Sequence, residues 1–240
     1  AALVDKLNGQ GVEVSYQPVR ALVPGKGLLR VETGGRALRA RRVIVATGAR
    51  LRTLSVPQEE ALRGKGVSQC AHCDGYFFRG QDVVVVGGGD AALQEALVLA
   101  SGCRTVTIVA RSGLRAKAGY VERAAGATNI RFVWDSVVDA VLGDATVSGV
   151  RLRNVKRGAI TELACAGVFP FIGVEPNSGF LPPSVRRDAS GRVLTDECLR
   201  TSEPSVFAVG AVRTGYSGEL VNAAGEAAAA VAAIAGELAA

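Results

Sequence analysis

Two cysteines three positions apart form the part of this sequence best suited to chemistry. Residues 70–75 read Cys-Ala-His-Cys-Asp-Gly, and on a helical turn Cys70 and Cys73 would share one face, close enough to form a small disulfide ring. A helix N-terminus here would stabilise a thiolate, because its backbone N–H groups and dipole favour negative charge. Asp74 follows directly and could carry a proton to or from the second sulfur. The motif therefore predicts a redox-active dithiol.

A zinc site and a purely structural role are the alternatives for this cysteine pair. Structural zinc usually takes four ligands, often from two such pairs, and the sequence has no second Cys-x-x-Cys. A pair of buried, inert cysteines stays open. His72 is the only histidine; it could face solvent or, when charged, lower the pKa of a neighbouring thiol. With one histidine, a Ser-His-Asp hydrolase is nearly excluded. We expect the isolated Cys103, Cys165 and Cys198 to pack as small hydrophobic side chains.

A glycine-rich turn after the cysteine motif indicates a dinucleotide-binding site. Residues 87–92 read Gly-Gly-Gly-Asp-Ala-Ala, between a predicted strand at 81–86 and a predicted helix at 90–100. This strand–turn–helix context is the one that the dinucleotide fingerprint needs, and the pyrophosphate would lie at the helix N-terminus. A further strand is predicted at 105–109, so the order implies a parallel sheet. The candidate binding residues are Gly87, Gly89, Asp90 and Ala92.

Charges after the strand at 105–109 favour NADP(H) over NAD(H). An acidic residue at this strand end would hydrogen-bond the ribose of NAD, but no Asp or Glu occurs between residues 96 and 121. Arg111 and Arg115 occur there instead and could hold a 2′-phosphate. A solvated basic loop is the alternative.

Length and composition fit an α/β protein that could hold two domains. The 240 residues are 48% hydrophobic, include 30 glycines and carry a net charge of +6. Basic residues are interspersed with acidic ones and aromatics are few, so we expect no nucleic-acid binding. No run reaches the roughly 18 uninterrupted apolar residues of a membrane span, and no signal peptide is visible. Five cysteines with one tight pair do not resemble a secreted disulfide framework. We expect a cytoplasmic protein that does not enter membranes.

The order of the predicted elements places one nucleotide-binding unit inside a second domain. Linkers are expected near residues 54–57 and 173–176, so a domain at 54–172 would be inserted between residues 1–53 and 173–240. Predicted elements of the outer domain are strands at 11–16, 43–46, 192–195 and 206–210 and a helix at 220–238; a short helix or turn is predicted at 59–64 in the insertion.

The chain resembles low-molecular-weight bacterial thioredoxin reductases and their flavin-dependent relatives. The fold that this resemblance implies is α/β, with two Rossmann-like three-layer domains, the NAD(P)-binding domain being inserted into an FAD domain. We expect the FAD domain to be incomplete, lacking the family's N-terminal Gly-rich βαβ unit. A homodimer is also implied, with the inserted domain rotating about its linkers. The matching stretches, in the family's order, are residues 43–49, 70–75 and 85–90, then 167–169 with 172–173 and 176–177, and finally 201–202 with 206–210.

The resemblance also implies a reaction. In the family NADPH reduces FAD, FAD reduces the cysteine pair, and the pair reduces the disulfide of a thioredoxin-like protein or a small disulfide. Cys73 would be the thiol nearest the flavin, Cys70 would attack the substrate disulfide, and Asp74 would donate and accept protons. The positions that would correspond to FAD-binding residues are Thr47, Gly48, Gly210, Glu219 and Leu220.

Three short segments depart from the family pattern. Ala211 replaces an Asp that contacts the ribityl chain of FAD, Gly218-Glu219 aligns with an Arg-Gln pair near the flavin ring, and Val109-Ala110-Arg111 aligns with His-Arg-Arg. Two other functions therefore stay open. One is a dithiol oxidase that passes electrons to oxygen, favoured by the loss of a cation at the 2′-phosphate site. The other is a flavin-less nucleotide-binding or scaffold protein, favoured by Ala211 and the expected missing segment.

Overall fold

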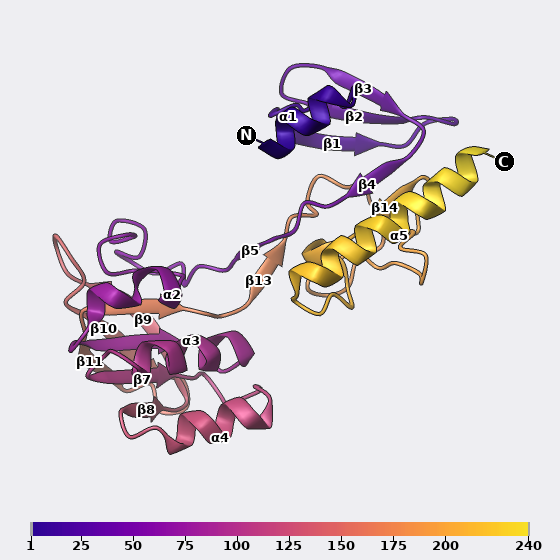
Figure 1. Ribbon diagram of the computed structural model, residues 1–240. Coiled ribbons are helices and arrows are strands. Elements are labelled where there is room, and N and C mark those ends of the chain that lie inside the picture. Colours follow the sequence, from indigo (N-terminus) through magenta and orange to yellow (C-terminus); the bar gives the residue numbers. More distant parts are fainter. Residues whose placement is uncertain (1, 240) are drawn as a thin grey trace. The chain divides into compact units, whose positions relative to one another are not determined.

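The computed structural model describes residues 2–239 and divides into two compact units (Figure 1). We call Leu51–Val174 the inserted unit, and Ala1–Arg50 with Glu175–Ala240 the outer unit. The bounds predicted for the insertion, 54–172, lie just inside these. The two chain segments that connect the units run as β5 (Ala49–Leu51) and β13 (Val174–Pro176), which pair with each other.

The inserted unit is built on a four-stranded parallel sheet in the order β12-β6-β7-β8. Helices α3 and α4 connect β6 to β7 and β7 to β8, as the βαβ prediction requires. The elements are β6 (Asp82–Val86), α3 (Asp90–Ala100), β7 (Thr105–Val109), α4 (Ala118–Gly126), β8 (Ile130–Val133) and β12 (Gly167–Pro170).

Both faces of this parallel sheet are covered, and residues 83–86 of β6 accordingly form an unbroken apolar run. Val83 and Val85 point into a core with Leu93 of α3, whereas Val84 and Val86 pack on the other face. That face is covered by an antiparallel sheet in the order β11-β10-β9, and the unit thus has three layers. The covering strands are β9 (Ser136–Leu142), β10 (Gly149–Asn154) and β11 (Ile160–Ala164).

The outer unit is layered around two parallel strands, β4 (Val43–Val45) and β14 (Val206–Ala208). Val45 and Val206 pack on one face, in a core with Leu22 of an antiparallel three-stranded sheet. Ile44 and Phe207 pack on the other face, in a core with Ala230 of α5. The remaining elements of this unit are α1 (Ala2–Gly9), β1 (Val19–Val23), β2 (Leu29–Thr33), β3 (Ala37–Ala40), the 3₁₀ turn η2 (Gly210–Val212) and α5 (Leu220–Ala239).

Two strands predicted in the outer unit are absent from the described chain. Residues 12–18 have no regular structure, and Val12 is 46% exposed. The predicted strand at 192–195 is reduced to isolated bridges that Val193 makes with Arg187 and Arg213. An alternating pattern produces a strand only where a neighbouring strand supplies its hydrogen bonds. The helix or turn predicted at 59–64 is a series of turns.

Helix α5 is the one helix in residues 2–239 that is long and apolar enough to cross a membrane by length and composition. Only 6% of the most apolar stretch of this helix is buried. One helix of this kind is weak evidence, and the expectation that the protein does not enter membranes stays a prediction.

Candidate functional site

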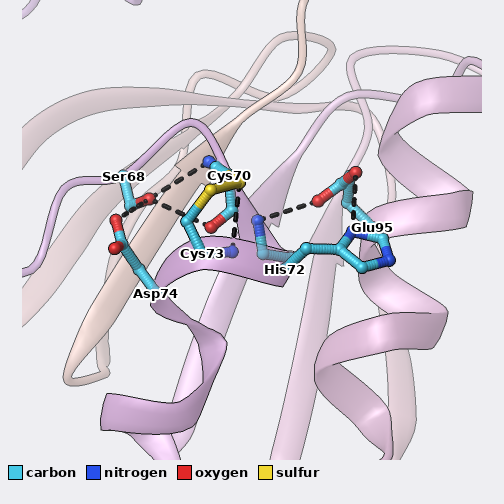
Figure 2. The surroundings of a disulfide bond; sticks show 7 residues. Ser68, Cys70, His72, Cys73, Asp74 and Glu95 are labelled. Atoms are coloured by element: carbon cyan, nitrogen blue, oxygen red, sulfur yellow. Dashed lines mark hydrogen bonds and ion pairs between the residues drawn. A yellow bond between two sulfur atoms is a disulfide. The ribbon is translucent and has the colours of Figure 1, made fainter.

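Cys70 and Cys73 form a disulfide, with their Cα atoms 5.3 Å apart (Figure 2). Cys70 is the N-cap of the short helix α2 (Ala71–Asp74), and the backbone N–H of Cys73 donates to the Cys70 sulfur at 3.1 Å. Cys70 is half-buried and Cys73 is exposed. The 3₁₀ turn η1 (Gly75–Phe78) follows at once, and its Phe78 packs edge-on against Phe169 of β12, 5.3 Å between ring centroids. The cysteine turn is thereby anchored to the sheet.

Ser68 fixes the carboxylate of Asp74 beside the disulfide. Its hydroxyl donates to Asp74 Oδ2 at 2.6 Å and accepts from the backbone N–H of Cys70 at 3.1 Å. Ser68 is 9% exposed, so both bonds lie largely out of solvent. A hydroxyl can donate and accept at once, and Ser68 therefore joins the predicted proton carrier to the cysteine turn. Sequence reasoning missed this residue, although it precedes the motif by only two positions.

Glu95 of α3 approaches the same turn from the other side (Figure 2). Its Oε2 accepts from the backbone N–H of Ala71 at 2.8 Å, and its Oε1 lies 3.6 Å from His72 Nδ1. The Glu95 side chain is 19% exposed and that of His72 is 63% exposed. A second carboxylate that sequence reasoning missed therefore lies one peptide group from Cys70.

The glycine-rich turn between β6 and α3 has the geometry of a phosphate cradle. Gly87 has φ +140°, and a Cβ there would lie 2.3 Å from the carbonyl oxygen of Phe171, so only glycine fits. Gly89 is the N-cap of α3, with open space where a Cβ would be. Because glycine has no side chain to cap the helix, the first N–H groups of α3 can meet an anion. Ala92 is fully buried beneath the turn.

The loop after β7 folds onto this turn and brings the predicted arginines with it. The backbone N–H of Arg115 donates to the Gly88 carbonyl at 2.7 Å, and that of Lys117 donates to Asp90 Oδ1 at 2.7 Å. Arg111 and Arg115 are both exposed. The turn thus fits the pyrophosphate of a dinucleotide at the N-terminus of α3, and Arg111 and Arg115 lie on the loop that contacts the turn.

Candidate flavin residues Thr47, Gly48 and Gly210 follow the carboxyl ends of β4 and β14. Because these strands are parallel neighbours, the residues lie at one edge of the sheet, where ligands of open α/β sheets bind. Thr47 Oγ1 donates to the Asn177 carbonyl at 2.7 Å, and Asn177 Nδ2 donates back to the Thr47 carbonyl at 2.9 Å. Gly48 has φ +64°, in the left-handed region that favours glycine.

Gly210 and the start of α5 form the rest of this edge. The backbone N–H of Gly210 donates to Glu226 Oε2 at 2.7 Å, and Glu226 also pairs with Arg213 at 2.7 Å. The carbonyl of Glu219 accepts from two N–H groups of the first turn of α5, and Leu220 is 84% exposed. The role of these outer-unit residues in flavin binding stays a prediction.

The other three cysteines fall into two classes. Cys103 and Cys165 are buried, and burial raises the pKa of Cys103 to about 11 and that of Cys165 to about 12. They are small hydrophobic side chains, as predicted. Cys198 is exposed, so the same prediction was wrong for it.

We expect only Cys198 among these three to react with iodoacetamide in the native protein near pH 8. The thiolate is the reactive form, and raised pKa values keep Cys103 and Cys165 protonated below about pH 10. Peptide mass spectrometry should find one alkylated cysteine outside the 70–73 pair before denaturation and three afterwards. Rapid native labelling of Cys165 would contradict its burial.

Comparison with known proteins gives consistent matches. Residues 2–228 match the family described as "Pyridine nucleotide-disulphide oxidoreductase". Over 204 residues the chain is 42% identical to the thioredoxin reductase of Treponema pallidum, covering 85% of this chain and 66% of the relative. Over 230 residues it is 41% identical to that of Streptomyces coelicolor, covering 93% and 71%. A crystal structure of Lactococcus lactis thioredoxin reductase matches with a TM-score of 0.81 and 38% identity, covering 95% and 76%. The chain spans about two thirds of the length of the curated relatives.

Proposed function

The chain therefore belongs to the pyridine nucleotide-disulphide oxidoreductase family, and from this we propose that it passes electrons from NADPH through FAD to the Cys70–Cys73 disulfide and on to a thioredoxin-like protein or small disulfide. The observation that carries the proposal is this disulfide, in a chain about 40% identical to named thioredoxin reductases. The same matches confirm the predicted resemblance to thioredoxin reductases and the predicted α/β fold of Rossmann-like domains.

The cysteine turn supplies the parts that disulfide exchange needs. After reduction, the Cys70 thiolate attacks one sulfur of the substrate, forms a mixed disulfide and releases the first substrate thiolate. Cys73 then attacks the Cys70 sulfur, which re-forms the protein disulfide and releases the second substrate thiolate. Asp74 would exchange protons with these sulfurs while Ser68 holds its carboxylate. Because Cys70 is half-buried in the disulfide form, its sulfur must become more accessible when the bond opens.

Two sets of residues would hold the cofactors. NADPH would lie on Gly87, Gly89, Asp90 and Ala92 with its 2′-phosphate toward the arginines. FAD would lie along the edge formed by Thr47, Gly48, Gly210, Glu219 and Leu220. When bound, FAD supplies the means of taking two electrons from NADPH and handing them to a disulfide.

We also propose a cytoplasmic homodimer that binds neither nucleic acid nor membrane. Support for the compartment comes from cysteine usage, since the Cys70–Cys73 pair is the one disulfide among the described residues. The dimer rests on the resemblance to the family alone.

The test uses one sample of the chain purified in the presence of FAD. A yellow protein whose flavin absorbance is bleached by NADPH but not by NADH, and which then reduces a thioredoxin disulfide, supports the proposal. A colourless protein that binds NADPH supports the flavin-less alternative. Rapid oxygen uptake driven by a small dithiol, with little NADPH consumption, supports the dithiol oxidase. Either of the last two results overturns the proposal.

Replacing both Arg111 and Arg115 with alanine should raise the Kd for NADPH by about tenfold to 100-fold, because each charge-assisted bond to the 2′-phosphate contributes about 1.5–3 kcal/mol, less where solvent screens it. The Kd for NADH should change by less than about twofold, since NADH has no 2′-phosphate. Titration followed by quenching of Trp134 fluorescence measures both constants. Arg157→Ala, in an exposed turn of the same unit, is the matched control. Equal weakening of both nucleotides would contradict the assignment.

A further inference from the structure

We propose that the carboxylate of Glu95 holds the Cys70–Cys73 couple toward its disulfide form by opposing thiolate formation. Glu95 would thus be a positioning residue for the electrostatics of the pair, without itself reacting. The inference rests on the redox role of the pair in the proposed function, but it requires neither FAD nor NADPH.

The first support is the fixed place of this carboxylate. Helix α3 is anchored by Leu93 and Ala96, both fully buried, so Glu95 is carried on a rigid element. Its Oε2 accepts from the N–H of Ala71, which directly follows Cys70, at 2.8 Å. Glu95 therefore brings a carboxylate to the peptide group that follows Cys70 and occupies an N–H of the cysteine turn that a thiolate could otherwise use.

The second support is the balance of charge around the turn. Asp74 lies on the opposite side of the disulfide from Glu95 (Figure 2) and is bonded to Ser68. The nearby basic side chains are exposed: His72 Nδ1 is 3.6 Å from Glu95 Oε1, and Arg79 stacks over the ring of Tyr76 at 5.1 Å. Tyr76 is itself exposed. Because solvent screens these exposed basic side chains more than the less exposed Glu95, the side-chain charges oppose negative charge on sulfur, against the backbone N–H of Cys73 that favours it.

The consequence can be written as a balanced exchange. The protein disulfide and two glutathione thiols give two protein thiols and one glutathione disulfide, with two electrons and two protons passing to the protein. A nearby carboxylate raises the free energy of the reduced protein only to the extent that one thiol is ionised. Removing that charge must therefore shift the exchange toward the dithiol at high pH and barely at low pH.

Glu95→Gln is the test, because the amide oxygen can still accept from Ala71 while the charge is gone. Wild type and variant are equilibrated in glutathione redox buffers, and their free thiols are then trapped by alkylation. Mass spectrometry of the peptide that carries Cys70 and Cys73 gives the fraction of dithiol, and Cys198 does not contribute because it lies on another peptide. At about pH 9 the exchange constant should rise by about three- to tenfold toward the dithiol, a tenfold change being about 30 mV. At about pH 6 it should change by less than about twofold. Glu122→Gln, an exposed carboxylate on α4, is the control for loss of charge alone.

Three results would overturn the inference: no shift, an equal shift at both pH values, or a shift toward the disulfide. Should Glu95→Gln fail to fold, His72→Lys tests the same electrostatic effect by a substitution at an exposed position. A lysine remains charged at about pH 9 and would offset Glu95, raising the constant about two- to threefold. Since no nucleotide or flavin is present, failure here leaves the proposed reductase activity standing. Loss of that activity in the flavin test likewise leaves this result intact.

Discussion

Replacing Cys73 with serine is expected to lower NADPH-dependent reduction of a thioredoxin disulfide by about 1000-fold or more. Serine cannot form the intramolecular disulfide that Cys70 and Cys73 make, so the two electrons that NADPH delivers to the flavin have no protein disulfide to pass to. Removing a covalent participant commonly costs this much or more. Bleaching of the flavin by NADPH should survive, because the nucleotide-binding residues are untouched. Steady-state turnover and anaerobic flavin reduction, measured on the same sample, separate the two steps.

Cys198→Ser is the matched control for this variant. It makes the same atomic change at an exposed, unpaired cysteine on the outer unit, and turnover should stay within about twofold of wild type. Retained turnover in Cys73→Ser would remove the role assigned to the pair. Loss of turnover in both variants would point to general damage by the substitution and not to redox chemistry.

The cysteine turn and the βαβ unit could be predicted because their signals are local. Cys70, Cys73 and the glycines from Gly87 onward lie in contiguous segments whose spacing alone determines which atoms meet. The strands at 43–46 and 206–210 were likewise visible as short apolar runs ending at small residues. Each of these predictions depended on neighbours in the chain and not on packing between distant segments.

The polar partners of the site could not be predicted in this way. Glu95 lies 24 residues from Ala71, and Asn177 lies 130 residues from Thr47. On the printed sequence Glu95 is one polar residue of an amphipathic helix and looks like a solvated side chain. Only the packing of α3 beside the cysteine turn reveals its contact with Ala71. Ser68 is nearer, but a serine before a motif carries no signal of its own.

The strand predicted at residues 11–16 is absent for a related reason, because a strand also depends on contacts with residues distant in the sequence. Val12 and Val14 alternate with polar residues, which favours a strand, yet this segment makes no ladder with a neighbouring strand in the described chain. An alternating pattern indicates which face a strand could bury. Whether the strand forms depends also on a neighbouring strand that supplies hydrogen bonds to its backbone.

Gly87→Ala should destabilise the inserted unit by about 3 kcal/mol or more and abolish the increase in melting temperature caused by NADPH. The added Cβ would lie 2.3 Å from the carbonyl oxygen of Phe171 and 3.1 Å from the Cβ of Ala92, at a backbone φ of +140°. Neither neighbour can yield, since Phe171 is hydrogen-bonded to Val86 at the end of β6 and Ala92 is fully buried. Strain of this kind costs roughly 1–3 kcal/mol before the clash is counted.

Gly119→Ala in α4 makes the same chemical change where a Cβ meets nothing within 4 Å. It should stabilise the unit by about 0.5 kcal/mol, since alanine is the better helix former. Urea unfolding followed by the fluorescence of Trp134, the only tryptophan, reports on the inserted unit in both variants. A lower free energy of unfolding in Gly87→Ala together with a higher one in Gly119→Ala would show that the nucleotide turn depends on the close backbone approach at Gly87 and not on glycine content as such. A Gly87→Ala protein as stable as wild type would show that the turn can open without cost, and the cradle assigned to it would then lack its physical basis.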